Sequence, residues 1–228
     1  MICQPSSSKP MNENRPVLVV SPPRSGSSLT ASILQSSGLF GGETKEGDRW
    51  NARGYFENLE ITELVVEYLK SNDTSSLGKR YHPENLSATC PGFGPNVVGI
   101  MKEQGLNTGQ RWFYKNTKIP LCWQMWNRAF PEAQWVIVQR EREQIIRSLL
   151  RAPFMNAYDS RDDWNRFLDT YDRLLSQIRL SCSTHTINID DIFDNREGPI
   201  ERMFEYVSRG YLKEAKMQVD RRLWHAQA

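Results

Sequence analysis

The chain has 228 residues, of which 39% are hydrophobic, 25% charged and 11% aromatic. These values exclude a disordered chain, and the length suits one large domain with a sizeable core. With 29 Lys and Arg against 27 Asp and Glu, the formal net charge is only +2, so we expect neither nucleic acid nor a membrane surface as a partner. Any affinity for anions must be local.

The four cysteines lie far apart in the sequence: Cys3, Cys90, Cys122 and Cys182. This spacing argues against a zinc site and against a dense disulfide framework. Residues 1–15 are polar and lack the apolar middle of a signal peptide, and no apolar run approaches the length of a membrane span. We therefore expect a flexible tail over residues 1–15, a single domain over residues 16–228, and a cytoplasmic protein.

The first predicted element is an apolar, β-branched run at residues 16–20, typical of a strand covered on both faces of a parallel sheet. A turn over residues 21–28 leads to a predicted helix at residues 29–37, and a second helix is predicted at residues 59–69. Residues 71–95 are polar and rich in turn formers. We interpret them as a lid or substrate loop, or as a connection without one ordered structure.

Strands and helices alternate in the second half of the chain. Further strands are predicted at residues 111–114, 134–139 and 184–189. Helices are predicted where apolar residues recur at helical spacing, over residues 123–130, 142–151, 164–180 and 199–207. This alternation predicts an α/β fold, a three-layer sandwich with a mainly parallel central sheet.

The turn between the first strand and its helix has the composition of an anion-binding loop. Such turns aim free backbone N–H groups and the positive end of a helix at a ligand. Gly26 allows close backbone approach, and Arg24 adds a planar, permanently charged group suited to phosphate or sulfate oxygens. The alternative is a plain turn with a solvated arginine. The candidate binding residues here are Pro23, Arg24, Ser25, Gly26, Ser27 and Ser28.

This turn differs from the nucleoside-triphosphate P-loop, G-x-x-x-x-G-K-[ST], because it has no Gly-Lys pair. Pro22 stands near the place of the first glycine, and Arg24 precedes Gly26. A P-loop-like nucleotide or small-molecule kinase is therefore a weakened alternative. An inactive nucleotide-binding module that has kept the fold is a second one.

A second candidate anion site follows the strand predicted at residues 134–139. Arg140 leaves this strand at the ligand-bearing edge, and Ser148 lies eight residues later in the following helix. One phosphate group fits between the two side chains. Arginine at a strand end is common. The spacing of Arg140 and Ser148 therefore indicates an anion site only in combination with the turn over residues 21–28.

Together, residues 21–29 and residues 136–148 resemble the two cofactor motifs of sulfotransferases that use 3′-phosphoadenosine-5′-phosphosulfate (PAPS). The first is similar to the family's 5′-phosphosulfate loop and the second to its 3′-phosphate motif. Residues 51–57, Asn-Ala-Arg-Gly-Tyr-Phe-Glu, resemble an Asn-Pro-Arg-Gly-Tyr-Trp/Phe-Glu segment of the bacterial branch, with alanine replacing proline. Residues 115–118, Lys-Asn-Thr-Lys, resemble its Lys-Asp-Pro-Arg segment. The resemblance runs from about residue 16 to residue 207 and implies the P-loop-NTPase-like sulfotransferase fold.

The resemblance implies transfer of a sulfuryl group from PAPS to a hydroxyl, with release of 3′,5′-ADP and without a metal. It places Arg24 against the bridging oxygen of the nucleotide, and Lys115, beyond a strand end, within reach of the phosphosulfate. Glu57 is the first candidate for the base that takes the acceptor proton; its alternative is a helix-start glutamate. Glu43, in a Gly-Gly-Glu-Thr segment similar to one in tyrosylprotein sulfotransferases, is the second. The acceptor, a small molecule or a carbohydrate, and the oligomeric state stay open.

Overall fold

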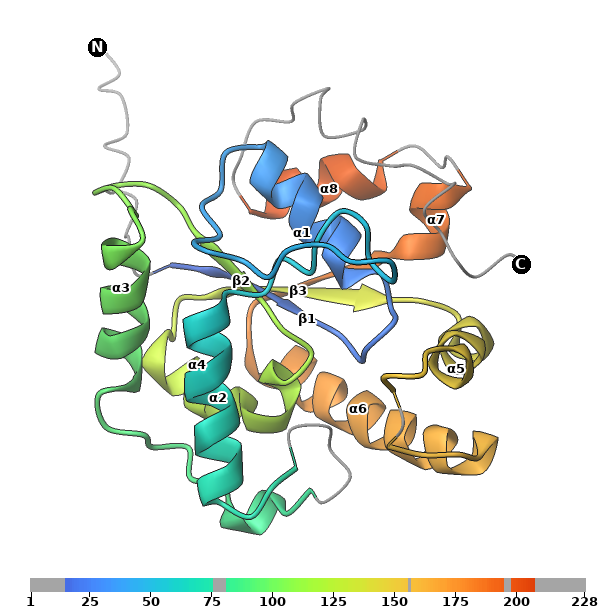
Figure 1. The fold of residues 1–228 in the computed structure, drawn as a ribbon. Helices are drawn as coiled ribbons and strands as arrows, with labels where there is room; N and C mark the ends of the chain where they lie inside the picture. The colour runs from blue at the N-terminus through green and yellow to red at the C-terminus, as the bar shows by residue number, and fades with distance from the viewer. Residues whose placement is uncertain (1–14, 76–80, 156, 195–197, 208–228) are drawn as a thin grey trace, which may run out of the picture.

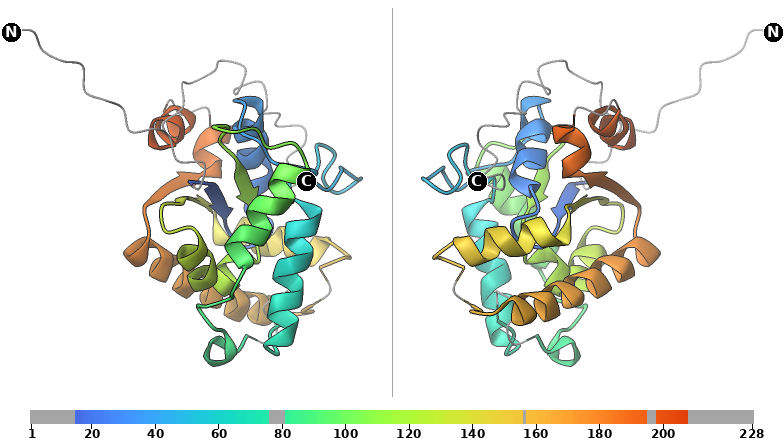
Figure 2. Two further views of the ribbon diagram at one scale, coloured as in Figure 1. Left: turned by 90° about the vertical axis from the view of Figure 1, so that its left-hand side faces the viewer. Right: turned by 90° about the vertical axis from the view of Figure 1, so that its right-hand side faces the viewer.

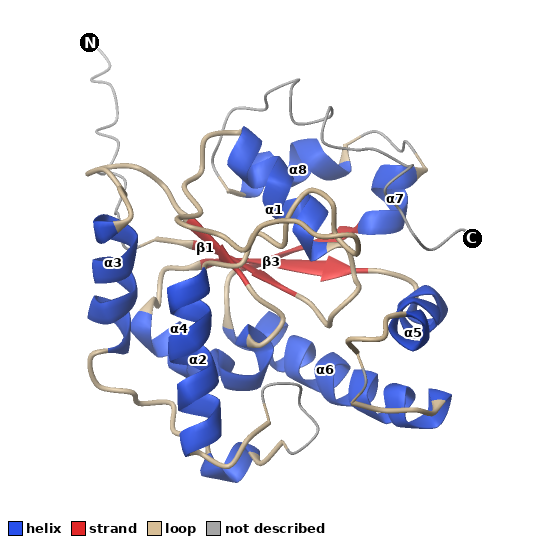
Figure 3. Cartoon of the chain, in the orientation of Figure 1, coloured by secondary structure: helices blue, strands red, loops and turns tan. Residues whose placement is uncertain are grey.

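The computed structural model describes residues 15–75, 81–155, 157–194 and 198–207. Its strands form one parallel sheet with the order β2-β1-β3-β4 (Figure 1, Figure 3). The strands are β1 (Val17–Val20), β2 (Phe113–Lys115), β3 (Gln134–Gln139) and β4 (Thr184–Asn188). The predicted α/β class and parallel sheet are confirmed.

Helices cover both faces of the sheet. One face carries α1 (Ser27–Ser36), α7 (Ile189–Phe193) and α8 (Pro199–Tyr206). The other carries α2 (Leu59–Ser71), α3 (Phe93–Glu103), α4 (Trp123–Ala129), α6 (Arg161–Ser181) and inward residues of α5 (Arg142–Arg151). Figure 2 shows α6 crossing the sheet on the side opposite α1 and α8. Short 3₁₀ turns lie at η1 (Pro83–Asn85) and η2 (Ile119–Cys122).

Two separate cores form because side chains along a strand alternate between the faces of the sheet. In β1, Val17 and Val19 pack in the core beneath α1, whereas Leu18 and Val20 pack in the core beneath α6. All four side chains are fully buried. This double burial explains the unbroken apolar run that predicted the strand.

Most predicted elements are present, with boundaries that shift by a few residues. Helix α1 begins at Ser27 rather than residue 29, and α6 begins at Arg161 rather than residue 164. Two helices, α3 and α7, were not predicted. In α3 the glycines and a proline obscure the helical period, although Pro95 lies in the first turn, where it removes no intrahelical hydrogen bond.

Some predictions lie wholly or partly outside the described residues. Except for Arg15, the expected tail at residues 1–15 is outside them, as are residues 76–80 of the expected lid and residues 208–228. The described part of the lid segment includes η1 and the start of α3. No helix in the described parts of the chain is both long enough and apolar enough to cross a membrane.

Candidate active site

A cavity of about 320 Å³ opens at the carboxyl edge of the sheet. This volume lies at the lower end of the range of small-molecule sites, roughly 300 to 1,000 Å³. Among the described lining residues, six side chains are basic and only Glu57 is acidic. The basic residues are Arg24, Lys45, Arg53, Lys115, Lys118 and Arg140. A chain with a net charge of +2 thus concentrates positive charge at one place, which suits an anionic ligand.

The loop after β1 presents backbone donors to this cavity. Gly26 has φ 87° and precedes α1 as its N-cap, and no side chain caps the helix start. The N–H groups of a first helical turn have no intrahelical partners, and they carry the positive end of the helix dipole. Ser27 and Ser28 line the cavity at this turn, so their hydroxyls add to the donors.

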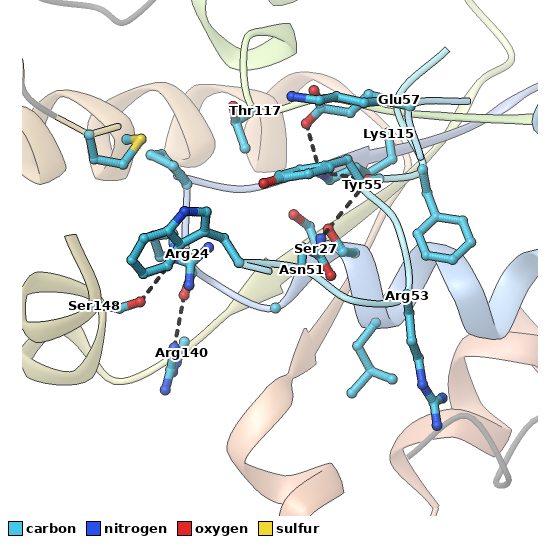
Figure 4. Close-up of a pocket in the computed structure, with 18 of the residues that line it drawn as sticks. Arg24, Ser27, Asn51, Arg53, Tyr55, Glu57, Lys115, Thr117, Arg140 and Ser148 are labelled. Atoms are coloured by element: carbon cyan, nitrogen blue, oxygen red, sulfur yellow. Dashed lines mark hydrogen bonds and ion pairs between the residues drawn. The ribbon is translucent and has the colours of Figure 1, made fainter. Parts of the chain in front are cut away.

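Three residues from the two predicted anion motifs converge beside this loop (Figure 4). Arg24 Nε donates a hydrogen bond to Ser148 Oγ at 2.9 Å, and Arg140 Nη1 donates to the carbonyl oxygen of Arg24 at 3.0 Å. The opposite side of the Arg140 guanidinium binds Gln144 Oε1. The loop after β1 is therefore joined to α5 by charged donors.

The segment from Asp48 to Glu57 folds across the start of α1. The Asp48 carboxylate accepts hydrogen bonds from the backbone N–H of Trp50 at 2.8 Å and from the Tyr55 hydroxyl. Asn51 Nδ2 donates to Ser28 Oγ at 3.1 Å. This turn brings Asn51, Tyr55 and Glu57 to the cavity that the first loop lines.

Glu57 forms a buried ion pair with Lys115 of β2. Lys115 Nζ lies 2.7 Å from Glu57 Oε1, and the exposed fractions of the side chains are 4% for Lys115 and 17% for Glu57. Burial alone raises the pKa of the Glu57 carboxyl, but the charges of Lys115 and Lys118 outweigh it and hold this pKa below its usual value. Glu57 is therefore ionised at neutral pH.

Basic side chains outnumber acidic ones among the described residues that line the cavity. Burial, together with the nearby charge of Arg24, lowers the pKa of Arg140 to about 10, and the charge of Asp190 opposes this shift. Burial also lowers the pKa of Arg24 and of Lys118. Arg24 and Arg140 remain protonated near neutral pH, and an anion beside them offsets the cost of placing them together.

The fold has relatives among solved structures, although no protein-family model and no curated protein sequence matches the chain. The sulfotransferase domain of the Synechococcus olefin synthase superposes with a TM-score of 0.60 at 15% identity, covering 93% of this chain and 80% of that one. The chain has the sulfotransferase fold. The sulfotransferase domain of the curacin biosynthetic pathway gives 0.59 at 14% identity, covering 90% and 78% of the two chains. A Mycobacterium tuberculosis sulfotransferase gives 0.50 at 14%, covering 90% and 70%.

Within this sulfotransferase fold, most of the sequence-predicted site residues line the one cavity: Pro23, Arg24, Gly26, Ser27, Ser28, Glu57, Lys115, Arg140 and Ser148. Ser25 does not line it; this residue is fully buried, and its hydroxyl has no hydrogen-bond partner among the described residues. The Glu43 side chain is exposed and also does not line it. Of the two candidate bases, Glu57 is the one placed at the cavity.

Several cavity residues were not predicted as site residues. Asn51 and Tyr55 belong to the segment singled out for Glu57, so their place in that segment was the available signal. The aromatic residues that line the cavity gave no such signal in the sequence, because Trp164, Phe167 and Tyr171 are spaced as ordinary inward residues of an amphipathic helix. Among the described residues, no three His, Cys, Asp or Glu side chains are grouped to hold a metal ion.

Proposed function

We propose that the chain is a PAPS-dependent sulfotransferase that transfers a sulfuryl group to an acceptor hydroxyl. The observation that carries the proposal is the convergence of Arg24, Arg140 and Ser148 beside the uncapped start of α1. The arginines come from the ends of neighbouring parallel strands, β1 and β3, where ligands bind in open α/β sheets. The sulfotransferase fold of the chain supports this assignment.

The residues present fit such a nucleotide. The loop over residues 23–28 and the first turn of α1 would hold the 5′-phosphosulfate, and Arg140 with Ser148 would hold the 3′-phosphate. Guanidinium, hydroxyl and backbone N–H donors are the groups that proteins use for phosphate and sulfate oxygens.

When bound, PAPS supplies an activated sulfuryl group and a stable leaving nucleotide. Arg24, within this loop, carries a positive charge that would stabilise the negative charge growing on the departing bridging oxygen. Lys115 Nζ also donates a hydrogen bond to the backbone oxygen of Tyr55 at 3.1 Å. Tyr55 and Lys115 therefore help to fix the geometry of the cavity. Catalysis here depends mainly on positioning and on preorganised charge.

We assign Glu57 as the base that accepts the proton of the acceptor hydroxyl. Lys115 binds Glu57 Oε1, so Oε2 is the oxygen that would take the proton from the hydroxyl. Lys115 acts as a positioning residue in this step, because it orients the carboxylate and keeps it ionised. The ionised form is the one that a general base requires.

The test is calorimetric binding of 3′,5′-ADP against ATP with Mg²⁺, followed by a PAPS-consumption assay. We expect 3′,5′-ADP to bind and ATP to bind more weakly, with or without Mg²⁺. Arg140→Ala should weaken 3′,5′-ADP binding by about 10-fold or more, because a charge-assisted hydrogen-bonding group is lost. Arg147→Ala is the matched control, since Arg147 lies on the outer face of α5, the helix that follows Arg140, and pairs with Glu143.

The alternatives give different results in the same measurements. A kinase would bind ATP more tightly, in a Mg²⁺-dependent way, and would not require Arg140 for it. An inactive module would show no PAPS turnover with any acceptor and no loss of function in Arg24→Ala. Equal 3′,5′-ADP affinity in Arg140→Ala and Arg147→Ala would contradict the cofactor assignment.

A further inference from the structure

The guanidinium of Arg140 is held along two of its edges. Arg140 Nε and Nη2 both donate to Gln144 Oε1, at 3.1 and 2.9 Å, and Nη1 donates to the backbone oxygen of Arg24 at 3.0 Å. Because a guanidinium is planar, contacts along two edges fix both its position and the direction of its plane. Gln144 therefore decides, together with the Arg24 carbonyl, how Arg140 faces a ligand.

Gln144 lies behind Arg140 rather than in the cavity. Arg140 and Ser148 are among the described residues that line the cavity, and Gln144 is not. Gln144 and Ser148 are four residues apart in α5, so they lie one turn apart on the same face of the helix. Ser148 Oγ accepts the hydrogen bond from Arg24 Nε (Figure 4). This face of α5 thus gives each arginine a partner, Gln144 for Arg140 and Ser148 for Arg24.

The hydrogen bonds continue from Gln144 to the next strand of the sheet. Gln144 Nε2 donates to Glu141 Oε2 at 2.9 Å, and the backbone N–H of Glu141 donates to Asp190 Oδ2 at 3.0 Å. Asp190 lies in α7, directly after β4, and β4 is the neighbour of β3. A chain of hydrogen bonds from Asp190 to Arg24 therefore crosses the carboxyl ends of β4, β3 and β1.

The two ends of this chain fix the orientation of the Gln144 amide. An ionised carboxylate such as that of Glu141 only accepts hydrogen bonds, and a guanidinium only donates them. The amide must therefore turn its NH₂ group to Glu141 and its oxygen to Arg140, as the contacts at 2.9 Å on both sides show. A rotated amide would lose both contacts.

The partner of Arg140 in α5 is an uncharged amide, although a carboxylate would bind a guanidinium more strongly. Asp190 and Glu141 already bring negative charge near Arg140. A carboxylate in direct contact with the guanidinium would offset its charge and repel a phosphate. The amide of Gln144 fixes the guanidinium and leaves its positive charge to an anionic ligand.

We propose that Gln144 is a positioning residue of the 3′-phosphate site, and that its uncharged amide, acting through Arg140, sets the preference for a nucleotide with a 3′-phosphate over one without it. This inference rests on the proposed function, since it concerns the group assigned there to Arg140 and Ser148. Arg140 and Ser148 contact the phosphate, Gln144 holds Arg140, and Glu141 holds the amide of Gln144.

The experiment measures the binding of two nucleotides that differ only in the 3′-phosphate, 3′,5′-ADP and 5′-AMP, to the full chain by calorimetry. Gln144→Met removes the contact with Arg140 and keeps a long side chain that favours a helix. We expect it to weaken 3′,5′-ADP binding about 5- to 10-fold and 5′-AMP binding less than about twofold. A general loosening of α5 would weaken both nucleotides equally, so the ratio of the two Kd values separates the roles.

Gln144→Glu tests whether the missing charge matters. This variant can still contact Arg140, but its carboxylate repels both the 3′-phosphate and Glu141. We expect it to weaken 3′,5′-ADP binding more than Gln144→Met does, by about 10-fold or more. The control is Arg147→Met on the outer face of the same helix, where Arg147 pairs with Glu143. It should change neither affinity by more than about twofold.

A double-mutant cycle tests whether Gln144 acts through Arg140. In a chain that already carries Arg140→Ala, the side chain held by Gln144 is gone. Adding Gln144→Met should then change the 3′,5′-ADP affinity less than about twofold. An equal loss with and without Arg140 would show that Gln144 acts by another route and would overturn the inference.

The outcomes distinguish this inference from the proposed function. If the unaltered chain does not bind 3′,5′-ADP, the proposed function fails and the inference fails with it. If 3′,5′-ADP binds but Gln144→Met keeps the ratio of the two affinities, the inference is overturned and the proposed function stands. The same holds if Gln144→Glu binds 3′,5′-ADP as tightly as the unaltered chain.

Discussion

Arg24 combines a guanidinium at the cavity with an unfavourable backbone conformation. Its φ of 67° lies in the left-handed region, which costs a residue with a Cβ atom roughly 1 to 2 kcal/mol. The surroundings hold this conformation, because Arg140 binds the Arg24 carbonyl and Ser148 binds its Nε. Strain of this kind persists where the position of a side chain matters more than stability.

Arg24→Gly and Arg24→Ala should therefore lose activity together but differ in stability. Both remove the charge that we propose acts on the bridging oxygen, so we expect turnover to fall about 100- to 1,000-fold in each. Glycine accepts the positive φ and alanine does not, so Arg24→Gly should be the more stable variant by about 1 kcal/mol. Urea unfolding of the two proteins measures the difference, and equal midpoints would show that the loop relaxes.

The pKa of Glu57 is set by opposed effects. Burial raises this pKa, but the charges of Lys115 and Lys118 lower it by a larger amount. Because the folded pKa is below the ordinary value of 4.5, the ion pair stabilises the fold above that pH. This stabilisation is lost as the pH falls through the lower, folded-state pKa.

Lys115→Met should move the acidic limb of the pH–rate profile upward. Without the Lys115 charge, burial acts on the carboxylate with less opposition, so the pKa of Glu57 rises and activity begins to fall at a higher pH. The variant should also lose about 3 kcal/mol of stability, because a buried charge loses its partner. The profile of kcat/KM between about pH 4 and pH 8 is the measurement. Lys70→Met, an exposed substitution on α2, is the control. If Lys115→Met gave the same profile as Lys70→Met, Glu57 would be excluded as the base.

At the scale of elements, helix α2 positions Glu57 through its N-cap. Asn58 is buried, and its Oδ1 accepts a hydrogen bond from the Ile61 N–H at 3.2 Å. Its Nδ2 donates to Gln104 Oε1 at 2.6 Å, which joins the helix start to the end of α3. The residue that follows the candidate base is therefore fixed on two sides.

Asn58→Ala should destabilise the protein and displace the base at the same time. Loss of a capping side chain costs about 1 to 2 kcal/mol, and kcat should fall because Glu57 is less well placed. Asn58→Ser restores the cap but not the contact with Gln104. We expect it to recover much of the stability, measured by thermal unfolding, and only part of kcat. Full recovery of both would show that the contact with Gln104 has no part in placing Glu57.

The elements differ in how well the sequence predicts them. The buried strands β1 and β3 were predicted within a residue, because double burial produces an apolar run that few other structures share. Helix α7 was missed because it has only five residues, too few to show a period, and its cap at Asn188 lies within the predicted strand. Helix α3 was missed because its glycines resemble those of a loop.

The parts of the candidate site that lie in short sequence motifs could be predicted. The first loop and the pair Arg140 and Ser148 were singled out from their residue types and spacing. The pairing of Glu57 with Lys115 was not, because it joins positions 58 residues apart and depends on how the segment from Asp48 folds back. The aromatic residues of α6 that line the cavity could not be predicted either, because cavity-lining and core aromatic residues follow the same helical period.

At the scale of the whole molecule, the charge distribution matters more than the net charge. The net charge is +2, yet six basic side chains meet a single acidic one in the described lining of the cavity. An anionic ligand is thus drawn to one place on an otherwise nearly neutral protein. Binding of an anionic ligand should weaken as salt is added, because ions partly screen the charges of the half-buried Arg24 and Arg140.

This distribution leads to a prediction for thermal stability. A ligand that binds only the folded state adds about 2.7 kcal/mol at a concentration 100 times its Kd, which raises the Tm of a chain of this size by about 5 to 10 °C. We expect 3′,5′-ADP to give such a shift at low ionic strength and a smaller one, at the same ligand concentration, in about 0.5 M salt. Differential scanning fluorimetry measures both. Arg140→Ala should lose most of the shift and Arg147→Ala should keep it, because Arg147 is on the outer face of α5. A shift of equal size in both variants would place the nucleotide away from the carboxyl edge of the sheet, and the charge concentrated there would then need another ligand.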